Sequence, residues 1–263
     1  MVSRQSPSFA AIEFAAKLGL DTLVFLGATQ QTVARAHDRR IRIIEPVFPY
    51  ADETFGETHP NAVQKVRDFE QAVLETRSGQ PWVRMHGENY RWQSFLLTRS
   101  LACYSHPESL AELETRVSRA LEFADDIAFD GFGFNNYYAC FCDRCSGLRQ
   151  EAAREDTNRS DVQKIADVSA RTLVEVHHRL HDHAKSVRPD TLVINHVWPK
   201  FLPDEYIGFR YKLDFCTQTI SWFYPPEWRI ERVEAEVASD QPLCPLHRHR
   251  RQTRAGSLTR TTV

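Results

Sequence analysis

Short apolar runs alternate with longer stretches of helical periodicity along most of the chain. The apolar runs that predict strands are residues 22–27, 41–48, 126–130, 191–197 and 213–219. The stretches that predict helices are residues 7–18, 29–40, 61–76, 107–124, 226–239 and, with a break near residues 158–160, 148–188. The strands are apolar on both faces, as in a parallel sheet that helices cover on both sides. The alternation therefore predicts an α/β fold.

Polar side chains stand at the ends of several of these strands. They are Glu45, Asp130, Asn195, His196 and Gln218. Functional groups at the carboxyl ends of parallel strands are typical of a (β/α)8 barrel, whose active site lies at that face. Only five or six strands can be counted, and the residues after 240 offer no last strand. We therefore expect a (β/α)8 TIM-barrel-like domain over residues 1–240 that is incomplete at its C-terminal end.

Charge is distributed unevenly along the 263 residues. The whole chain has 33 basic and 35 acidic side chains and a net charge of −2, which predicts neither a nucleic-acid binder nor a membrane-surface protein. Residues 241–263 nevertheless contain five arginines and no acidic residue. We expect this segment to be a solvated, poorly ordered basic tail, with a contact to nucleic acid as the less favoured alternative.

Targeting signals are not evident in the sequence. The chain has no window of about 18 uncharged apolar residues that would predict a membrane span. Glu13, Lys17 and Asp21 interrupt the apolar stretch near the N-terminus, where a secretory signal needs an uninterrupted apolar region. We expect a cytoplasmic protein whose cysteines are reduced.

Three cysteines are concentrated in the loop expected between residues 131 and 147. Cys140, Cys142 and Cys145 form a C-x-C-x-x-C turn, which can direct three sulfurs at one point, as tetrahedral zinc requires. Cys103 is the expected fourth ligand, and His106 is the alternative. Three unmetallated thiols or an iron–sulfur cluster are the other interpretations of this motif. Four thiolates would leave no open coordination position, so the zinc would be structural and would hold the loop that follows Asp130.

A second group of potential metal ligands lies in the expected helix that ends near residue 188. His177 and His181 are four residues apart and would share one helix face. The glutamate that accompanies such a pair in helical zinc proteases is missing between them. We therefore favour a structural role for these histidines.

The region around the cysteines resembles known protein families. Cys103-Tyr-Ser-His-Pro-Glu108 precedes a helix, a strand that ends in Phe129-Asp130-Gly131, and the run Asn135-Asn-Tyr-Tyr-Ala-Cys140-Phe-Cys-Asp-Arg-Cys145. This arrangement resembles uncharacterised glycoside-hydrolase-like TIM barrels. It is also similar to the family 42 β-galactosidases, whose zinc cluster uses one earlier cysteine and the same triplet. The strong part of the resemblance covers about residues 84–150.

The resemblance implies a barrel that acts on carbohydrate. It places Asp130 at the end of the fourth strand, where such enzymes carry a catalytic carboxylate. The sequence departs from the family in two places. The β-galactosidases have an Asn-Glu pair where this chain has Phe129-Asp130, and the uncharacterised relatives are expected to have an acid near Gln218. An amide cannot donate a proton as a general acid.

Glycoside hydrolysis through paired carboxylates requires two of them about 5–5.5 Å apart for retention or about 6.5–9.5 Å apart for inversion. Asp130 is the first candidate, because it follows an apolar strand. Glu88 and Glu45 are candidates for its partner, since Glu88 lies in a polar cluster and Glu45 ends another strand. Solvated carboxylates with no catalytic role are the alternative interpretation of each.

Aromatic and polar residues near the strand ends are candidates for substrate binding. Sugars present apolar ring faces and hydroxyl pairs, which aromatic and charged side chains bind. The candidates are Arg84, His86, Tyr90, Trp92, Asn135, His196, Trp198 and Trp222. We expect a glycoside hydrolase or a degenerate relative; the alternative is a non-catalytic carbohydrate-binding or scaffold barrel stabilised by structural zinc.

Overall fold

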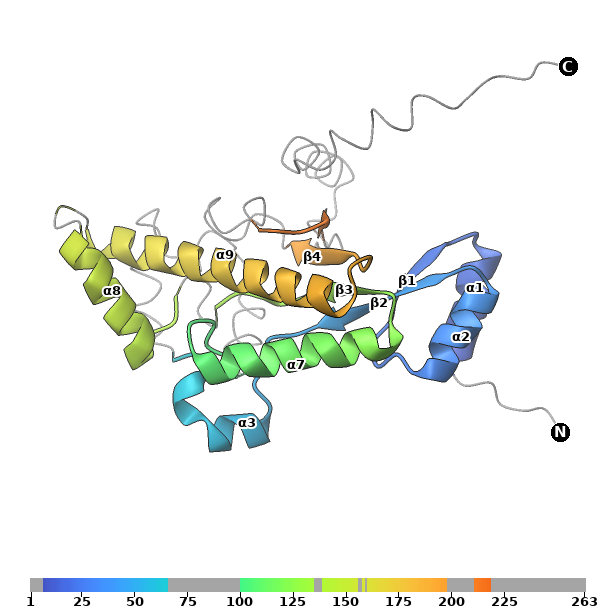
Figure 1. Ribbon diagram of the computed structural model, residues 1–263, viewed down its shortest axis with the longest axis horizontal. Coiled ribbons are helices and arrows are strands. Elements are labelled where there is room, and N and C mark those ends of the chain that lie inside the picture. Colours follow the sequence, from blue (N-terminus) through green and yellow to red (C-terminus); the bar gives the residue numbers. More distant parts are fainter. Residues whose placement is uncertain are drawn as a thin grey trace, which may run out of the picture.

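The computed structural model describes residues 7–65, 100–134, 139–155, 158, 160–197 and 211–218. Five strands form one sheet in the order β1-β2-β3-β4-β5, and every neighbouring pair is parallel (Figure 1). The strands are β1 (Thr22–Val24), β2 (Arg42–Val47), β3 (Asp126–Phe129), β4 (Val193–Val197) and β5 (Phe215–Gln218). The α/β fold with a parallel sheet is therefore confirmed.

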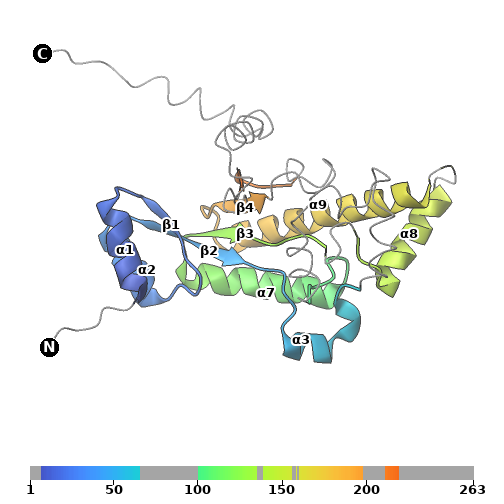
Figure 2. The same ribbon diagram turned by 180° about the vertical axis from the view of Figure 1, so that it is seen from behind.

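Helices connect the strands, as the βα rhythm requires. They are α1 (Pro7–Lys17), α2 (Gln30–Asp38), α3 (Glu53–Thr58), α7 (Pro107–Phe123), α8 (Asp143–Glu155) and α9 (Asp161–Val187), with a 3-10 turn at Pro60–Ala62. Seen from behind in Figure 2, α1 and α2 lie together beside β1, whereas α7 and α9 extend along the rest of the sheet. Within the described part of the chain, no helix combines the length and the apolar character needed to cross a membrane.

Local sequence signals explain where several helices begin. Thr29 and Ser160 cap α2 and α9 through capping boxes, in which the side chain three residues later bonds back to the cap. The Asp52 side chain accepts a hydrogen bond from the Phe55 amide at the start of α3. Pro107 occupies the first turn of α7, where a missing amide proton costs no intrahelical hydrogen bond.

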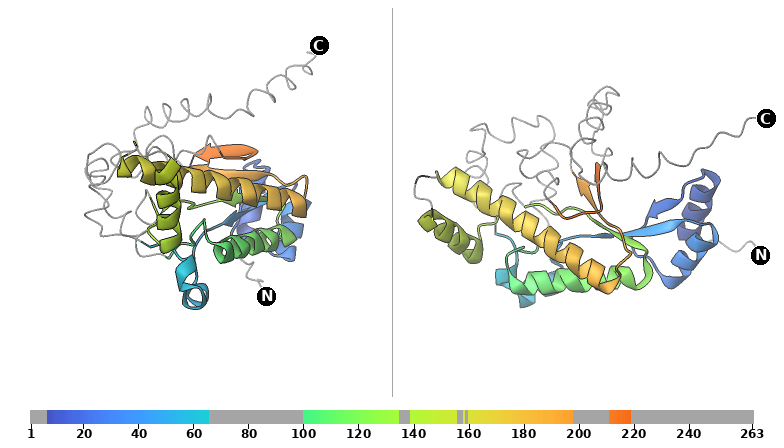
Figure 3. Two further views of the ribbon diagram at one scale, coloured as in Figure 1. Left: turned by 60° about the vertical axis from the view of Figure 1, so that its left-hand side comes forward. Right: turned by 45° about the horizontal axis from the view of Figure 1, so that its top comes forward.

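The two faces of the sheet have different neighbours. Ile127, Phe129 and Val193 pack with apolar side chains of α7 and α9, and Ile43 packs with α1 and α2. The alternate residues Ile44, Ala128 and Ile194 form a separate small cluster. Figure 3 shows the long helices on one side of the curved strands. The helices thus cover the face that carries the odd-numbered residues of β2, β3 and β4.

An ion pair between a buried carboxylate and an exposed guanidinium joins the amino ends of the central strands. Asp126, the first residue of β3, is 1% exposed. Its carboxylate accepts hydrogen bonds from Arg42 Nε at 2.9 Å and Arg42 Nη2 at 2.7 Å, and from the Leu192 amide at 2.7 Å. One carboxylate therefore ties β2 and β3 to the residue before β4.

Three sequence expectations differ from the structure. The helix expected from residue 61 is wrong over its first residues, because Val63 forms an antiparallel bridge with Ala102. Helix α3 was not expected. The loop expected to reach residue 147 ends earlier, since α8 begins at Asp143. The remainder of the helix expected at 61–76, the helix expected at 226–239, the domain boundary at residue 240 and the basic tail at 241–263 lie outside the described residues.

Candidate functional site

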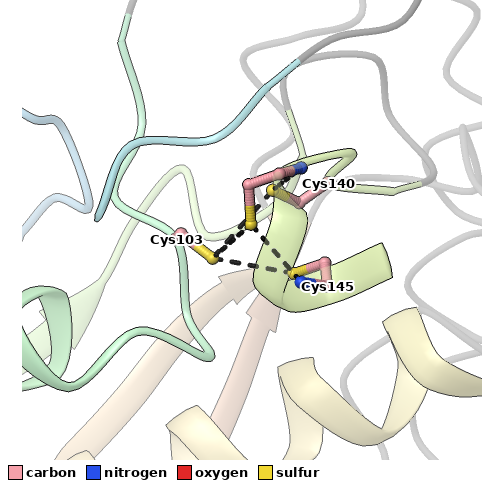
Figure 4. Close-up of side chains that lie close together, drawn as sticks. Cys103, Cys140 and Cys145 are labelled. Carbon is pink, nitrogen blue, oxygen red and sulfur yellow. Dashed lines mark hydrogen bonds between the residues drawn. The ribbon is translucent and has the colours of Figure 1, made fainter. Parts of the chain in front are cut away.

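Four buried cysteines from two distant segments lie together at the carboxyl side of the sheet. Cys103 comes from the segment between β2 and α7, and the triplet comes from the segment between β3 and α8. Figure 4 shows the side chain of Cys103 directed toward those of Cys140 and Cys145. The backbone amide of Cys103 donates to the Ala62 carbonyl, and Cys145 lies in the first turn of α8. The cluster therefore joins the segment before α7 to the segment that leads into α8.

The sulfur positions suit a tetrahedral ion. Cys103 Sγ lies 3.5 Å from Cys142 Sγ, 3.6 Å from Cys145 Sγ and 3.9 Å from Cys140 Sγ, and the four sulfurs all lie within 4.8 Å of one another. Four sulfurs about 2.3 Å from a tetrahedral zinc ion would be about 3.8 Å apart, whereas a disulfide needs about 2.05 Å. The four cysteines therefore form a group that could hold a metal ion such as zinc.

Ionisation of the thiols also favours a cation. The hydrogen bond with Cys103 lowers the pKa of the Cys142 thiol, but hydrogen bonding to Cys103 raises the pKa of both Cys140 and Cys145. The hydrogen bond with Cys140 likewise lowers the pKa of the Cys103 thiol, so two of the thiols lose their protons more readily than usual and the other two less readily. Four thiolates in this small space would also repel one another. A bound divalent cation would remove this repulsion, because metal binding requires deprotonated sulfur.

His106, the alternative fourth ligand, and His177, from the separate helical histidine pair, make other contacts. His106 precedes the first residue of α7, and its Nδ1 lies 2.5 Å from Glu108 Oε2. His177 is fully buried, with Nδ1 2.7 Å from the Leu173 carbonyl and Nε2 3.2 Å from Asn195 Nδ2. Burial lowers the pKa of His177 to about 4, so the ring is neutral at pH 7. These contacts agree with the structural role that the sequence favoured for His177.

Hydrogen bonds of Tyr104 and Gln64 connect the segment of Cys103 with the loop after β3. Tyr104, the residue after Cys103, is buried, and its hydroxyl donates to the Gly133 carbonyl at 2.7 Å and accepts from the Gly133 amide at 3.1 Å. Gln64 Nε2 donates to the carbonyls of Gly133 and Ala102, both at 3.1 Å. Burial raises the pKa of Tyr104 well above its usual value, so the hydroxyl stays protonated and able to donate.

Asp130 stands between this loop and an aromatic pair. Its amide donates to the Val47 carbonyl at 3.0 Å, which continues the pairing of β2 with β3 one residue beyond Phe129. The half-buried rings of Phe48 and Tyr50 stack at 5.2 Å between centroids and 7° between planes. Gly131 has a φ of +70°, and a Cβ atom there would lie 3.4 Å from the Tyr50 hydroxyl oxygen. The half-buried Asp130 is thus followed at once by a close approach to aromatic rings.

Asp130 directly follows β3, which is the third strand of the described sheet and pairs with β2. Asp130 therefore lies at a carboxyl strand end. The resemblance implied the fourth strand of a whole barrel, and this number stays a prediction because the described strands form only part of a barrel.

Glu45 is engaged with a different part of the fold. Its carboxylate accepts hydrogen bonds from the Gly27 amide at 2.7 Å and from the Ala28 amide at 2.8 Å. Those amides belong to the turn between β1 and α2, so Glu45 holds that turn against β2. A catalytic role for Glu45 stays a prediction, and catalysis would compete with these two bonds.

Replacing Glu45 with glutamine is expected to destabilise the fold. One of its oxygens would become an amide NH2 group and could no longer accept from Gly27 or Ala28, which leaves a backbone donor without its charged acceptor. We expect a loss of about 2 kcal/mol in the free energy of unfolding, measured by urea denaturation. Glu57→Gln, at an exposed position on α3, should change it by less than about 0.5 kcal/mol. Equal stabilities of the two variants would contradict the assignment.

Most of the predicted substrate-binding residues fall outside the described part of the chain. The residues outside it are Arg84, His86, Tyr90, Trp92, Asn135, Trp198 and Trp222. The catalytic candidate Glu88 also lies outside the described residues. Only the backbone of His196 is described, as part of β4. These assignments stay predictions.

Several residues of the site were not identified from the sequence. Phe48 and Tyr50 follow a strand directly, which is the same signal that pointed to Trp198. Tyr104 is adjacent to a predicted ligand, but only the fold brings its hydroxyl to Gly133. No sequence signal marks Gln64, whose partners are backbone groups of two distant segments.

Comparison with known proteins adds information on the fold. Neither a family model nor a curated protein matches the sequence. Among solved structures, the β-galactosidase from Bacillus circulans sp. alkalophilus matches with a TM-score of 0.59 and 11% identity over 90% of this chain and 40% of that chain. The fold of this chain therefore matches part of the fold of this β-galactosidase.

Two further β-galactosidases match in the same way. The enzyme from the psychrophilic Marinomonas ef1 has a TM-score of 0.57 and 9% identity over 88% of this chain and 41% of that chain. The enzyme from the Antarctic haloarchaeon Halorubrum lacusprofundi has a TM-score of 0.53 and 14% identity over 82% of this chain and 38% of that chain. The chain therefore spans about two fifths of the length of these enzymes, and its five described strands form a partial barrel.

Proposed function

We propose that this partial barrel binds and processes carbohydrate in the manner of glycoside hydrolases, with Asp130 as a catalytic carboxylate. The observation that carries the proposal is the position of Asp130 at a carboxyl strand end, where the next residue, Gly131, lies against the stacked rings of Phe48 and Tyr50. A carboxylate supplies acid, base or nucleophile chemistry, and an aromatic ring can pack against the apolar face of a sugar. The fold supports the proposal because active sites of such barrels lie at this face.

The four cysteines would bind zinc in a structural role. Four thiolates complete the tetrahedral coordination of zinc and leave no position for substrate or water. The ion would fix Cys103 against the triplet, and Tyr104 would carry that restraint to Gly133, three residues after Asp130. The metal would therefore position the loop beside the proposed catalytic carboxylate without contacting the substrate.

A second candidate function is carbohydrate binding without catalysis. It is favoured by the engagement of Glu45, whose two hydrogen bonds to Gly27 and Ala28 oppose a role as the second carboxylate. The two functions share the carbohydrate site and differ in whether a bond is cleaved.

Asp130→Asn is expected to abolish hydrolysis while leaving the fold intact. The amide is similar in shape to the carboxylate but can neither attack the sugar nor transfer a proton, so turnover should fall at least about 100-fold. The measurement is the release of nitrophenol from a panel of aryl glycosides by the wild type and the variant, with the metal content and the thermal transition of each recorded.

Asp190→Asn is the matched control, because Asp190 is exposed and precedes β4 at the opposite edge of the sheet. Turnover that Asp130→Asn leaves unchanged would remove Asp130 from the mechanism. If the wild type binds a sugar in calorimetry but hydrolyses no member of the panel, the non-catalytic function replaces the proposed one.

A further inference from the structure

Backbone amides of the cysteine turn donate hydrogen bonds to two of the four sulfurs. The amide of Cys142 donates to Cys140 Sγ at 3.5 Å, and the amide of Cys145 donates to Cys142 Sγ at 3.5 Å. The turn itself therefore supplies one backbone donor to each of two sulfurs. These bonds place partial positive charge next to thiolates that a metal site would keep deprotonated.

The other two sulfurs lie within hydrogen-bond distance of one hydroxyl. The hydroxyl oxygen of Ser105 lies 3.2 Å from Cys103 Sγ and 3.2 Å from Cys145 Sγ. If both sulfurs are thiolates, the hydroxyl must be the donor, because thiolates carry no proton. Its single proton is then directed at one of the two sulfurs at a time or shared between them.

The position of Ser105 is fixed by the surrounding chain. Its carbonyl accepts a hydrogen bond from Arg144 Nε, and the carbonyl of Cys103 accepts one from the His106 amide at 3.0 Å. Ser105 itself is half-buried. The hydroxyl is therefore held between two segments that a metal ion would also connect.

We propose that Ser105 is a positioning residue of the metal site, whose single hydroxyl proton is shared between the thiolates of Cys103 and Cys145 and thereby increases the affinity of the site for the ion. This inference rests on the proposed metal binding. Four thiolates around a divalent cation carry a net charge of −2, and this charge lies among buried side chains. Donors to sulfur stabilise that charge, and groups of this kind commonly change metal affinity by about 10- to 100-fold.

The test is metal competition on the full chain. Wild type, Ser105→Ala and Ser105→Thr are loaded with zinc, and transfer of the ion to a chromophoric chelator is followed at equilibrium. Ser105→Ala should bind one zinc ion about 10- to 100-fold more weakly than wild type, and Ser105→Thr should restore most of the affinity because it keeps the hydroxyl. Ser146→Ala is the matched control, since the Ser146 hydroxyl accepts from Arg149 rather than contacting a sulfur.

A spectrum of the cobalt-substituted protein separates hydrogen bonding from a loss of packing. A donor to a thiolate lowers the energy of the sulfur lone pair, so its removal should shift the sulfur-to-cobalt charge-transfer band to longer wavelength in Ser105→Ala. Ser105→Thr and Ser146→Ala should keep the wild-type band.

The outcomes distinguish the two levels of the proposal. A wild-type chain that binds neither zinc nor cobalt would overturn the metal site itself. If the wild type binds the ions, but Ser105→Ala equals Ser146→Ala in affinity and in spectrum, only the role of Ser105 is overturned. A weaker affinity of Ser105→Ala without a spectral shift would also overturn it, because the loss would then not arise from a bond to sulfur.

Discussion

Cys142→Ser is expected to release the metal ion and to destabilise the partial barrel strongly. Cys142 is buried in the same apolar cluster as Cys103, and their sulfurs are 3.5 Å apart. An ion that binds the folded but not the unfolded chain stabilises the fold by about 4 kcal/mol when the free metal concentration is 1,000 times Kd. The Cys142→Ser variant should lose this stabilisation. The measurements are the zinc content of the purified protein and the thermal transition with and without added zinc.

Cys244→Ser provides the control for the loss of a thiol. Cys244 was not assigned to the metal site from the sequence, so this variant should keep the zinc content and the transition of the wild type. A Cys142→Ser protein that retains stoichiometric zinc and an unchanged transition would show that the four sulfurs do not hold an ion. Addition of a strong chelator to the wild type should reproduce the effect of the substitution.

Arg42→Met is expected to produce the second large loss of stability. The substitution keeps an unbranched side chain but removes both hydrogen bonds from the guanidinium to Asp126, whose carboxylate is 1% exposed. Breaking a fully buried ion pair commonly costs about 3–5 kcal/mol. We expect the lower end, about 3 kcal/mol, because the Arg42 side chain is half exposed and the Leu192 amide still donates to Asp126. Urea denaturation at pH 7 measures the change.

Two further variants test the cause of that loss. Arg39→Met removes an ion pair with the more exposed carboxylate of Glu13 and should cost much less than Arg42→Met, because solvent screens exposed charges. Combining Arg42→Met with Asp126→Asn should recover part of the stability, because the neutral amide does not need a charged partner. A double variant less stable than Arg42→Met would show that the ion pair is not the source of the effect.

The sequence predicted the strands well, because in a parallel sheet they are short apolar runs bounded by turns. It could not determine which face of a strand a polar residue occupies in the folded protein. Glu45 was expected at a strand end and lies in β2, yet its carboxylate turns to the amides of Gly27 and Ala28. That turn forms only when β1 pairs with β2, so local pattern alone carries no information about it.

For the cysteine group, the sequence predicted the metal ligands but not the groups that form hydrogen bonds with them. The spacing of Cys140, Cys142 and Cys145 indicated a shared point, since one short turn can bring three sulfurs together. The donors that support it were invisible in the sequence, because Ser105 approaches Cys145 only through tertiary contacts. The helix expected from residue 61 was wrong at its start for a related reason, since pairing of Val63 with Ala102 overrides local helix preference.

The contact between Cys103 and Cys140 has a consequence for the unfolding of the chain. The two residues are 37 positions apart, and the segment between them contains α7 and β3. An ion that stays bound would turn this segment into a closed ring, and closing a ring of that size reduces the entropy of the disordered chain by about 4 kcal/mol at 25 °C in the simplest polymer treatment. Helix α7 and strand β3 could still unfold inside this ring, but the unfolded chain would be less favourable for as long as the ion stays bound.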